Sequence, residues 1–332
     1  MAPPKATFFE PSSHDTVVCT LCPIECSIAP NRSGHCGVRS NRRGELVLDS
    51  YGRVSVLEPV IPERLPLFHH DPHLRWLLAG QRGCNMRCPF CTTSRYSQLA
   101  GAPQEPLAPE ELVEQAVLQE CGGVSFGIAE PVVSLEYVLD VFALAKQAGL
   151  KRHVATNGYL CEEPLRDLLA GLDAVTFGFK GADPRFHLDV VGGQLETTRH
   201  ALDAAIAVGV HTEATYLVIP GRTDRTEDAE AFAELLGQTP IRFPVVLLPF
   251  EPSFQWREAA PASLAAVEAF RRLLEALGHP AYVAHEDSTR LDTRCGKCGR
   301  TLVRRSGAQQ VLFEPGARQC PHCRHPLPFT LD

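Results

Sequence analysis

Residues 76–91 read WLLAGQRGCNMRCPFC, and the interpretation of the whole chain depends on this stretch. Its apolar run, Trp76–Ala79, predicts a short strand, and a loop with Cys84, Cys88 and Cys91 follows directly. Thiolates bind iron–sulfur clusters, and a four-iron cluster normally takes four of them. Three would leave one iron open to a substrate or cofactor. A zinc site that lacks one ligand and chance clustering are the alternatives, although zinc sites favour two close cysteine pairs.

Strands and helices are predicted to alternate from Leu74 onward. The further predicted strands are Gly123–Phe126, His153–Thr156, Ala174–Phe179, His211–Ile219, Arg242–Leu248 and Pro280–Ala284. The predicted helices are Pro109–Glu120, Ser134–Gln147, Glu162–Ala170, Thr197–Val208, Thr226–Leu236 and Ala262–Leu277. About six β/α units indicate an α/β fold with a parallel sheet, as a barrel, a partial barrel or a doubly wound sheet. In each of these, chemistry collects at the C-terminal ends of the strands.

Two cysteine-bearing segments flank this region. We expect residues 1–73 to form a small module with a connector, residues 74–285 the β/α domain, and residues 286–332 a third unit. Within the first segment, Glu45–Leu57 predicts a hairpin. The connector sequence HHDPH, with His69, His70 and His73, predicts surface residues.

The 332-residue chain holds thirteen cysteines, an odd number. Its start lacks the apolar stretch of a secretory signal, so we expect a cytoplasmic protein whose thiols stay reduced and bind metal. No segment has the roughly 20 apolar residues needed to cross a membrane. The net charge of −7 argues against a protein that coats nucleic acid, although residues 287–332 hold eight Lys and Arg against four Asp and Glu.

The C-terminal segment carries the pattern of a zinc ribbon. Two C-x2-C pairs are separated by 21 residues, and four thiolates on two turns make a closed tetrahedral zinc site. The ligands expected are Cys295, Cys298, Cys320 and Cys323, with His322 as a less favoured substitute.

The N-terminal segment has a less regular spacing. Cys19, Cys22, Cys26 and Cys36 predict a second zinc site or an auxiliary iron–sulfur cluster that passes electrons to the first cluster. Zinc is favoured, because nothing nearby resembles a ferredoxin sequence. In a third alternative, the N- and C-terminal cysteines share one site.

The loop sequence C-x3-C-x-F-C resembles that of the radical SAM superfamily. Further stretches, among them CTLCPIECSIAPNRSGHCGVR, TNGY, VIPGRTD and DTRCGKCGRTLVRR, occur in an order similar to that of AmmeMemoRadiSam-type enzymes, which are relatives of pyruvate formate-lyase activating enzymes. The similarity spans nearly the whole chain, with a gap at about residues 249–288. It implies a partial (β/α)6 barrel with small cysteine-rich metal-binding modules at both ends.

The same resemblance implies a [4Fe-4S] cluster on Cys84, Cys88 and Cys91, with S-adenosyl-L-methionine on the open iron. Glu130 is similar to the family acid near the methionine amino group, and Lys180 could pair with its carboxylate, so both are candidate catalytic residues. The candidate cofactor-binding residues are Phe90, Thr92, Glu130, Thr156, Asn157 and Lys180. A surface Glu, a plain turn and a solvated Lys are the alternatives for Glu130, Asn157 and Lys180.

Three departures from the family pattern concern the mouth of the site. Thr92-Thr93 replaces Gln-Asn, Gly178-Phe179 replaces Asp before Lys180, and LPFEPSFQW replaces an aromatic-His stretch. The cofactor chemistry is therefore better defined than the substrate.

By resemblance, the chain is expected to be an enzyme that cleaves S-adenosyl-L-methionine reductively and uses the 5′-deoxyadenosyl radical to take hydrogen from a peptide or small molecule. Activation of a glycyl-radical enzyme is one alternative, and a non-catalytic zinc-ribbon module that binds nucleic acid or protein is another. Electron transfer without turnover would need a fourth cluster ligand. The implied partners are an electron donor such as flavodoxin or ferredoxin, and Memo-like and AMMECR-like proteins.

Overall fold

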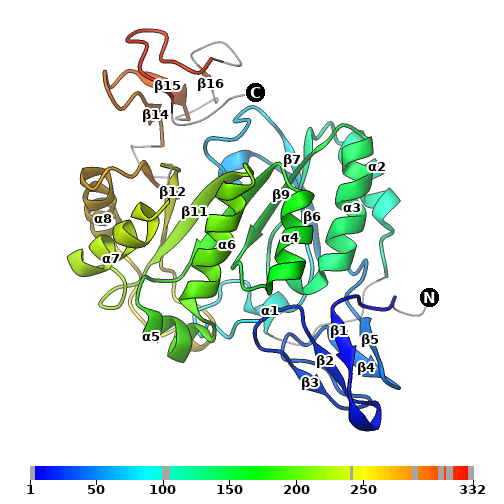
Figure 1. Ribbon diagram of the computed structural model, residues 1–332. Coiled ribbons are helices and arrows are strands. Elements are labelled where there is room, and N and C mark those ends of the chain that lie inside the picture. Colours follow the sequence, from blue (N-terminus) through cyan, green and yellow to red (C-terminus); the bar gives the residue numbers. More distant parts are fainter. Residues whose placement is uncertain are drawn as a thin grey trace.

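Strand β7 (Trp76–Gly80), which precedes the cysteine loop, lies next to one edge of an eight-stranded sheet in the computed structural model of the chain (Figure 1). The structure describes residues 4–98, 105–239, 242–285, 291–305, 310–311 and 317–327. Parallel to β7, and in chain order, run β8 (Gly123–Phe126), β9 (Lys151–Thr156), β10 (Ala174–Phe179), β11 (His211–Val218), β12 (Val245–Pro249) and β13 (Ala281–Val283).

The sheet is an open, partial barrel. Strand β6 (Val56–Val60) runs antiparallel to β7 at one edge, and β13 forms the other. No pairing joins β6 to β13 in the described part of the chain. Because each parallel strand lies beside its predecessor, right-handed crossovers place all the helices on one face. The prediction of a partial (β/α)6 barrel is thereby confirmed, and β13 corresponds to the last strand predicted at Pro280–Ala284. The edge strand β6 was not expected in this sheet.

Figure 1 shows helices covering one face of the sheet. They are α2 (Pro109–Leu118), α3 (Leu135–Gln147), α4 (Glu162–Ala170), α6 (Leu195–Ala207), α7 (Thr226–Gly237) and α8 (Leu264–Ala276). Helix α3 buries Leu135, Val138 and Phe142 at the spacing that predicted it. Strands β8 and β10 and helix α4 begin and end at the predicted residues. The short α1 (Ser94–Ser97), and α5 (Pro184–Phe186) with the π-helical turn after it, were not predicted.

The N-terminal module contains two small sheets. One consists of β1 (Phe9–Pro11), β2 (Val17–Cys19) and β3 (Ser27–Ile28), and the other of β4 (Arg39–Arg42) and β5 (Glu45–Leu48). The predicted hairpin Glu45–Leu57 is wrong, because β5 pairs with β4 and β6 joins the main sheet. The turn that decides this is Arg43-Gly44, where both residues have positive φ, as hairpin turns of two residues require.

Part of the connector packs against the start of β11 instead of lying on the surface. His69 and His70 are 2% and 6% exposed, so their predicted surface position is wrong, whereas His73 is exposed as expected. The backbone N–H of His69 donates to Glu213 Oε1 at 2.7 Å, and the ring of His70 lies 5.0 Å from that of His211. Both partners lie at the start of β11, far from the connector in sequence, so the connector sequence alone does not predict these contacts.

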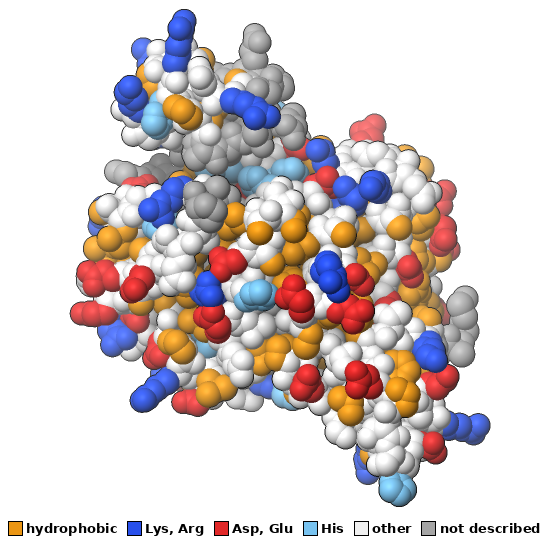
Figure 2. All heavy atoms as spheres, in the orientation of Figure 1, with side chains coloured by type: hydrophobic (Ala, Val, Ile, Leu, Met, Phe, Trp, Pro, Cys, Tyr) orange, Lys and Arg blue, Asp and Glu red, His pale blue; other side chains and the backbone are white. Residues whose placement is uncertain are grey.

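The C-terminal unit is a three-stranded sheet of β14 (Thr293–Arg294), β15 (Thr301–Arg304) and β16 (Gln310–Val311). Arg305 ties it to the connector, because its Nε donates to Glu63 Oε1 at 2.8 Å and its guanidinium lies 4.8 Å from the Phe68 ring. Figure 2 shows Lys and Arg side chains on this unit. The division of the chain at residues 73/74 and 285/286 stays a prediction, and residue 286 lies outside the described residues. Among the described residues, no helix is both long and apolar enough to span a membrane.

Candidate functional site

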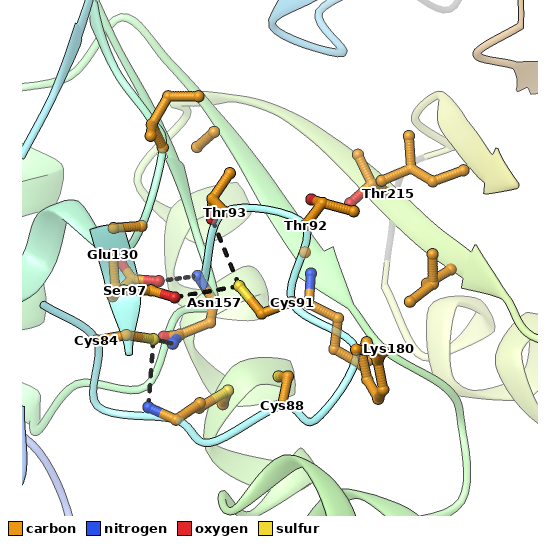
Figure 3. A pocket seen from close by; sticks show the side chains of 18 of the residues that line it. Cys84, Cys88, Cys91, Thr92, Thr93, Ser97, Glu130, Asn157, Lys180 and Thr215 are labelled. Atoms are coloured by element: carbon orange, nitrogen blue, oxygen red, sulfur yellow. Dashed lines mark hydrogen bonds between the residues drawn. The ribbon is translucent and has the colours of Figure 1, made fainter. Parts of the chain in front are cut away.

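A cavity of about 460 Å³ opens where the parallel strands end (Figure 3). The loop after β7 contributes Cys84, Cys88 and Cys91 to its wall. Later strands contribute Glu130, Thr156, Asn157, Lys180, Thr215 and Phe250. The predicted site residues are therefore brought together, because parallel strands in chain order end at one edge. The cavity lies beside the three cysteines and is large enough to take a cluster together with a small cofactor.

The three cysteines stand in different surroundings. Cys84 Sγ accepts from the Met86 N–H at 3.3 Å and lies 4.0 Å from Asn157 Nδ2. Cys91 Sγ lies 3.1 Å from Ser97 Oγ. Burial raises the pKa of Cys88 to about 11, while the Lys180 charge acts against the shift. Binding iron as thiolates would therefore release protons, and the N–H and cationic groups nearby favour that form.

Glu130 is a buried carboxylate, 4% exposed, in the loop after β8. Oε1 accepts from Thr156 Oγ1 at 2.6 Å, and Oε2 accepts from the Asn157 N–H at 2.8 Å. Burial raises its pKa to about 7, against the lowering effect of these hydrogen bonds and of Lys180. The alternative of a surface Glu is wrong, because the side chain is enclosed and aimed at the cavity.

Asn157 links Glu130 to the cysteine loop. Its Nδ2 donates to Asn85 Oδ1 at 2.8 Å, and its Oδ1 accepts from the Tyr159 N–H at 2.9 Å. The turn itself needs Gly158, whose φ is +67° and where an added Cβ would lie 3.0 Å from the Phe177 ring. Asn157 is therefore more than a turn residue, since its amide carries a buried network.

Lys180 follows β10 and is half-buried on the cavity wall. An added Cβ at Gly178 would lie 3.0 Å from Lys180 Nζ, so the glycine leaves room for the ammonium. The ammonium acts electrostatically on both Cys88 and Glu130. A purely solvated Lys does not fit this position, which faces a thiol and a carboxylate.

Aromatic residues close one side of the cavity region. Phe90 is buried, and its ring centroid lies 6.3 Å from that of Phe186 and 5.1 Å from that of Trp256. Thr92 is exposed on the cavity wall. The sequence analysis did not identify Phe186, Trp256 or Ser97 as site residues. Phe186 and Ser97 come from segments without a recognised motif. Trp256 ends the stretch LPFEPSFQW, which the sequence analysis placed at the mouth of the site without identifying this residue, and only the folded chain brings the three to Phe90 and Cys91.

The predicted C-terminal zinc ligands converge. The four sulfurs all lie within 4.8 Å of one another, with Cys295–Cys323 at 3.6 Å and Cys298–Cys320 at 3.8 Å. Zinc–sulfur bonds of about 2.3 Å in a tetrahedron place the sulfurs about 3.8 Å apart, so the group fits zinc.

The N-terminal cysteines Cys19, Cys22, Cys26 and Cys36 surround a separate, small cavity. Figure 1 places their module and the ribbon at opposite ends of the molecule. The alternative of one site shared between the N- and C-terminal cysteines is therefore wrong, because the ribbon cysteines gather among themselves. All thirteen cysteines carry free thiols.

The chain is similar to several known proteins. Residues 78–236 match the Radical SAM superfamily. An uncharacterized protein of Methanocaldococcus jannaschii is 29% identical over 342 residues, which cover 98% of this chain and 99% of that protein. The pyruvate formate-lyase-activating enzyme of Clostridium pasteurianum is 25% identical over 185 residues, covering 54% of this chain and 76% of that enzyme.

Among solved structures, the chain is similar to a radical SAM methyltransferase from Sphaerobacter thermophilus. The TM-score is 0.52 at 20% sequence identity, and the match covers 64% of this chain and 66% of the other. This likeness concerns the fold alone.

Proposed function

We propose that this chain, in which residues 78–236 form a radical SAM domain and which is related to pyruvate formate-lyase activating enzymes, cleaves S-adenosyl-L-methionine to start radical chemistry on a peptide or small molecule. When bound, a [4Fe-4S] cluster would supply the electron for this cleavage, and the resulting 5′-deoxyadenosyl radical would take a hydrogen atom from the substrate. Members of this superfamily are enzymes. The specific reaction is our proposal.

The observation that carries the proposal is the meeting of three cysteines, a buried carboxylate and a lysine on one cavity. Cys84, Cys88 and Cys91 would hold the cluster as thiolates. They supply three ligands, so one iron would stay open to the cofactor. A redox site without turnover would need a fourth ligand, and the cavity wall offers no fourth cysteine among the described residues.

Two charged groups would orient the methionine part of the cofactor. Glu130, fixed by Thr156 and the Asn157 N–H, would accept from its ammonium, and Lys180 would pair with its carboxylate. Both would bind and orient the cofactor, Glu130 in its ionised form. Phe90 and Thr92 would line the remainder of the cofactor site. Apolar walls exclude water, which strengthens the charged contacts.

The substrate is left as a peptide or small molecule, because the mouth of the cavity departs from the family pattern. The aromatic side chains that line the cavity, Phe90 and Phe250, suit an apolar or aromatic group. An electron donor such as flavodoxin or ferredoxin is part of the proposal, as the relatives named activating enzymes imply a redox partner. Memo-like and AMMECR-like partners stay predictions.

Glycyl-radical activation is a second candidate, favoured by the relatives named pyruvate formate-lyase-activating enzymes. It predicts a protein-based radical, detectable by electron paramagnetic resonance, when the reduced protein and S-adenosyl-L-methionine are mixed with a glycyl-radical enzyme. The first candidate would be favoured if S-adenosyl-L-methionine is cleaved without a glycyl-radical enzyme and no such signal appears when that enzyme is added.

The test of the proposed function is 5′-deoxyadenosine formation by reduced, oxygen-free protein. Cys88→Ala is expected to abolish it while the protein stays folded. The matched control is Cys121→Ala, because Cys121 is also buried but precedes β8 and therefore lies at the opposite end of the barrel. Wild-type rates from Cys88→Ala would contradict the assignment of the site.

A further inference from the structure

The four N-terminal cysteines enclose a cavity of about 10 Å³. Cys19 ends β2, Cys22 and Cys26 lie in the turn to β3, and Cys36 precedes β4. Backbone hydrogen bonds shape this arrangement, since the Cys19 N–H donates to the Cys26 carbonyl at 3.0 Å and the Glu25 N–H to the Cys22 carbonyl at 3.0 Å. Two separate segments are thus folded so that four cysteines line one small cavity.

A backbone amide hydrogen-bonds one of these sulfurs. The His35 N–H donates to Cys26 Sγ at 3.3 Å. Hydrogen bonds to an ionised acceptor stabilise it, and metal-bound cysteines are thiolates.

A buried arginine supplies an independent observation. Arg39 lines the cavity and is 1% exposed. Its Nε donates to the Val133 carbonyl at 3.0 Å and its Nη2 pairs with Glu136, but its buried Nη1 has no hydrogen-bond partner. An unpartnered guanidinium nitrogen beside four sulfurs calls for negative charge. Four thiolates around one divalent ion would carry a net charge of −2. The charge of Arg39 is already paired with Glu136, but its unpartnered Nη1 would offer this site a hydrogen-bond donor.

The size of the cavity favours a single ion over an iron–sulfur cluster. About 10 Å³ corresponds to roughly one water molecule or ion, whereas an iron–sulfur cluster also brings bridging sulfides. Among the described residues, only the ribbon cysteines form a group of three or more ligand atoms within 4.8 Å of one another, so zinc binding by the N-terminal cysteines requires their side chains to move closer together.

We infer that Cys19, Cys22, Cys26 and Cys36 bind one zinc ion, and that this closed site fixes the N-terminal module to the loop of the radical site. Tetrahedral sites with four sulfur ligands suit zinc. The inference does not rest on the proposed function, because it concerns a separate set of ligands.

Three contacts join the zinc module to the cysteine loop after β7. Asn85, which is fully buried, lines the small cavity and accepts from Asn157 Nδ2. Gly83 approaches so closely that an added Cβ would lie 2.9 Å from the Cys36 carbonyl oxygen. Arg87 donates to the His35 carbonyl. A metal that orders the module would therefore also order the loop.

The test counts metal in a variant that retains only these four cysteines as a metal-binding group. Ser replaces Cys84, Cys88, Cys91, Cys295 and Cys298. We expect about one zinc per chain, and visible absorption typical of tetrahedral cobalt thiolate after replacement with Co²⁺. Iron with sulfide in place of zinc, or no bound metal, would overturn the inference.

Adding Cys22→Ser to this variant is expected to remove the ion. The matched control is Cys161→Ser, because the Cys161 N–H donates to the Leu21 carbonyl but its thiol is not among those that line the cavity. Undiminished zinc after Cys22→Ser would place the ion elsewhere and overturn the assignment. If the Cys22→Ser protein does not fold, the metal count and cobalt spectrum of the parent variant decide. This background lacks the radical-site cysteines, so failure of the proposed function would not affect the result.

Discussion

Glu130→Gln is the substitution that examines the cofactor site most finely. The carboxylate is 4% exposed, and each oxygen already accepts a hydrogen bond from the protein. Gln retains the shape but loses the charge, so the ammonium of S-adenosyl-L-methionine would lose its anionic partner. Gln also places an NH2 group where one carboxylate oxygen accepts a hydrogen bond, so two hydrogen-bond donors would face each other.

The magnitude follows from these contacts. A hydrogen bond to a charged group contributes about 1.5–3 kcal/mol net, and a loss of about 2 kcal/mol weakens binding roughly 30-fold. The mismatched donor costs about 1–3 kcal/mol of folding free energy. We therefore expect weaker cofactor binding together with a lowered melting temperature.

Binding is measured by calorimetry on oxidised protein, in which the cofactor is not cleaved, with the iron content determined in each sample. Glu251→Gln is the matched control, because Glu251 lines the same cavity with an exposed side chain. Its affinity should stay within about twofold of the wild type. Unchanged affinity in Glu130→Gln with intact iron, or equal weakening in both variants, would refute the role of Glu130.

The remaining predictions concern the pH dependence of Glu130, the ribbon cysteines and Arg305. The pKa of Glu130 is raised to about 7, so the carboxylate must lose a proton to pair with the ammonium; affinity should rise up to about tenfold per pH unit until about pH 7, and Glu130→Gln should flatten this profile. In the unliganded protein the raised pKa has the opposite effect, which is on folding stability. The contribution of Glu130 to the free energy of unfolding is expected to fall as the pH rises from about 4.5 to 7, and denaturant titrations at several pH values measure this. Cys298→Ala should release zinc from the ribbon, measured by a chelator dye, and lower its stability. Arg305→Met should cost about 3 kcal/mol or more by leaving the Glu63 carboxylate buried without its partner, and a denaturation midpoint equal to that of the wild type would contradict this.

The strands and helices of the barrel could be predicted because their apolar spacing is regular and their ends carry recognisable turn residues. The three cysteines of the loop after β7 could be assigned to the site because they directly follow a strand. Two errors had physical causes. The hairpin that forms joins β4 to β5 through Arg43, whose positive φ arginine rarely adopts. The burial of His69 and His70 depends on partners that are distant in sequence.

Other features of the site depend on tertiary contacts that no local pattern encodes. Phe186 and Trp256 meet Phe90 from two short helical turns that are far apart in sequence, and Ser97 meets Cys91 because a one-turn helix places it there. Arg39 had no signal in the sequence, because its importance comes from burial beside the N-terminal cysteines.

The most direct measurement is the yield of 5′-deoxyadenosine per chain in anaerobic, reduced protein whose iron and zinc have been counted in the same sample. The account predicts about four irons, lost when Cys84, Cys88 and Cys91 are replaced together, and product formation that disappears with them. Zinc without iron and no 5′-deoxyadenosine, or product formation that survives the triple replacement, would contradict it.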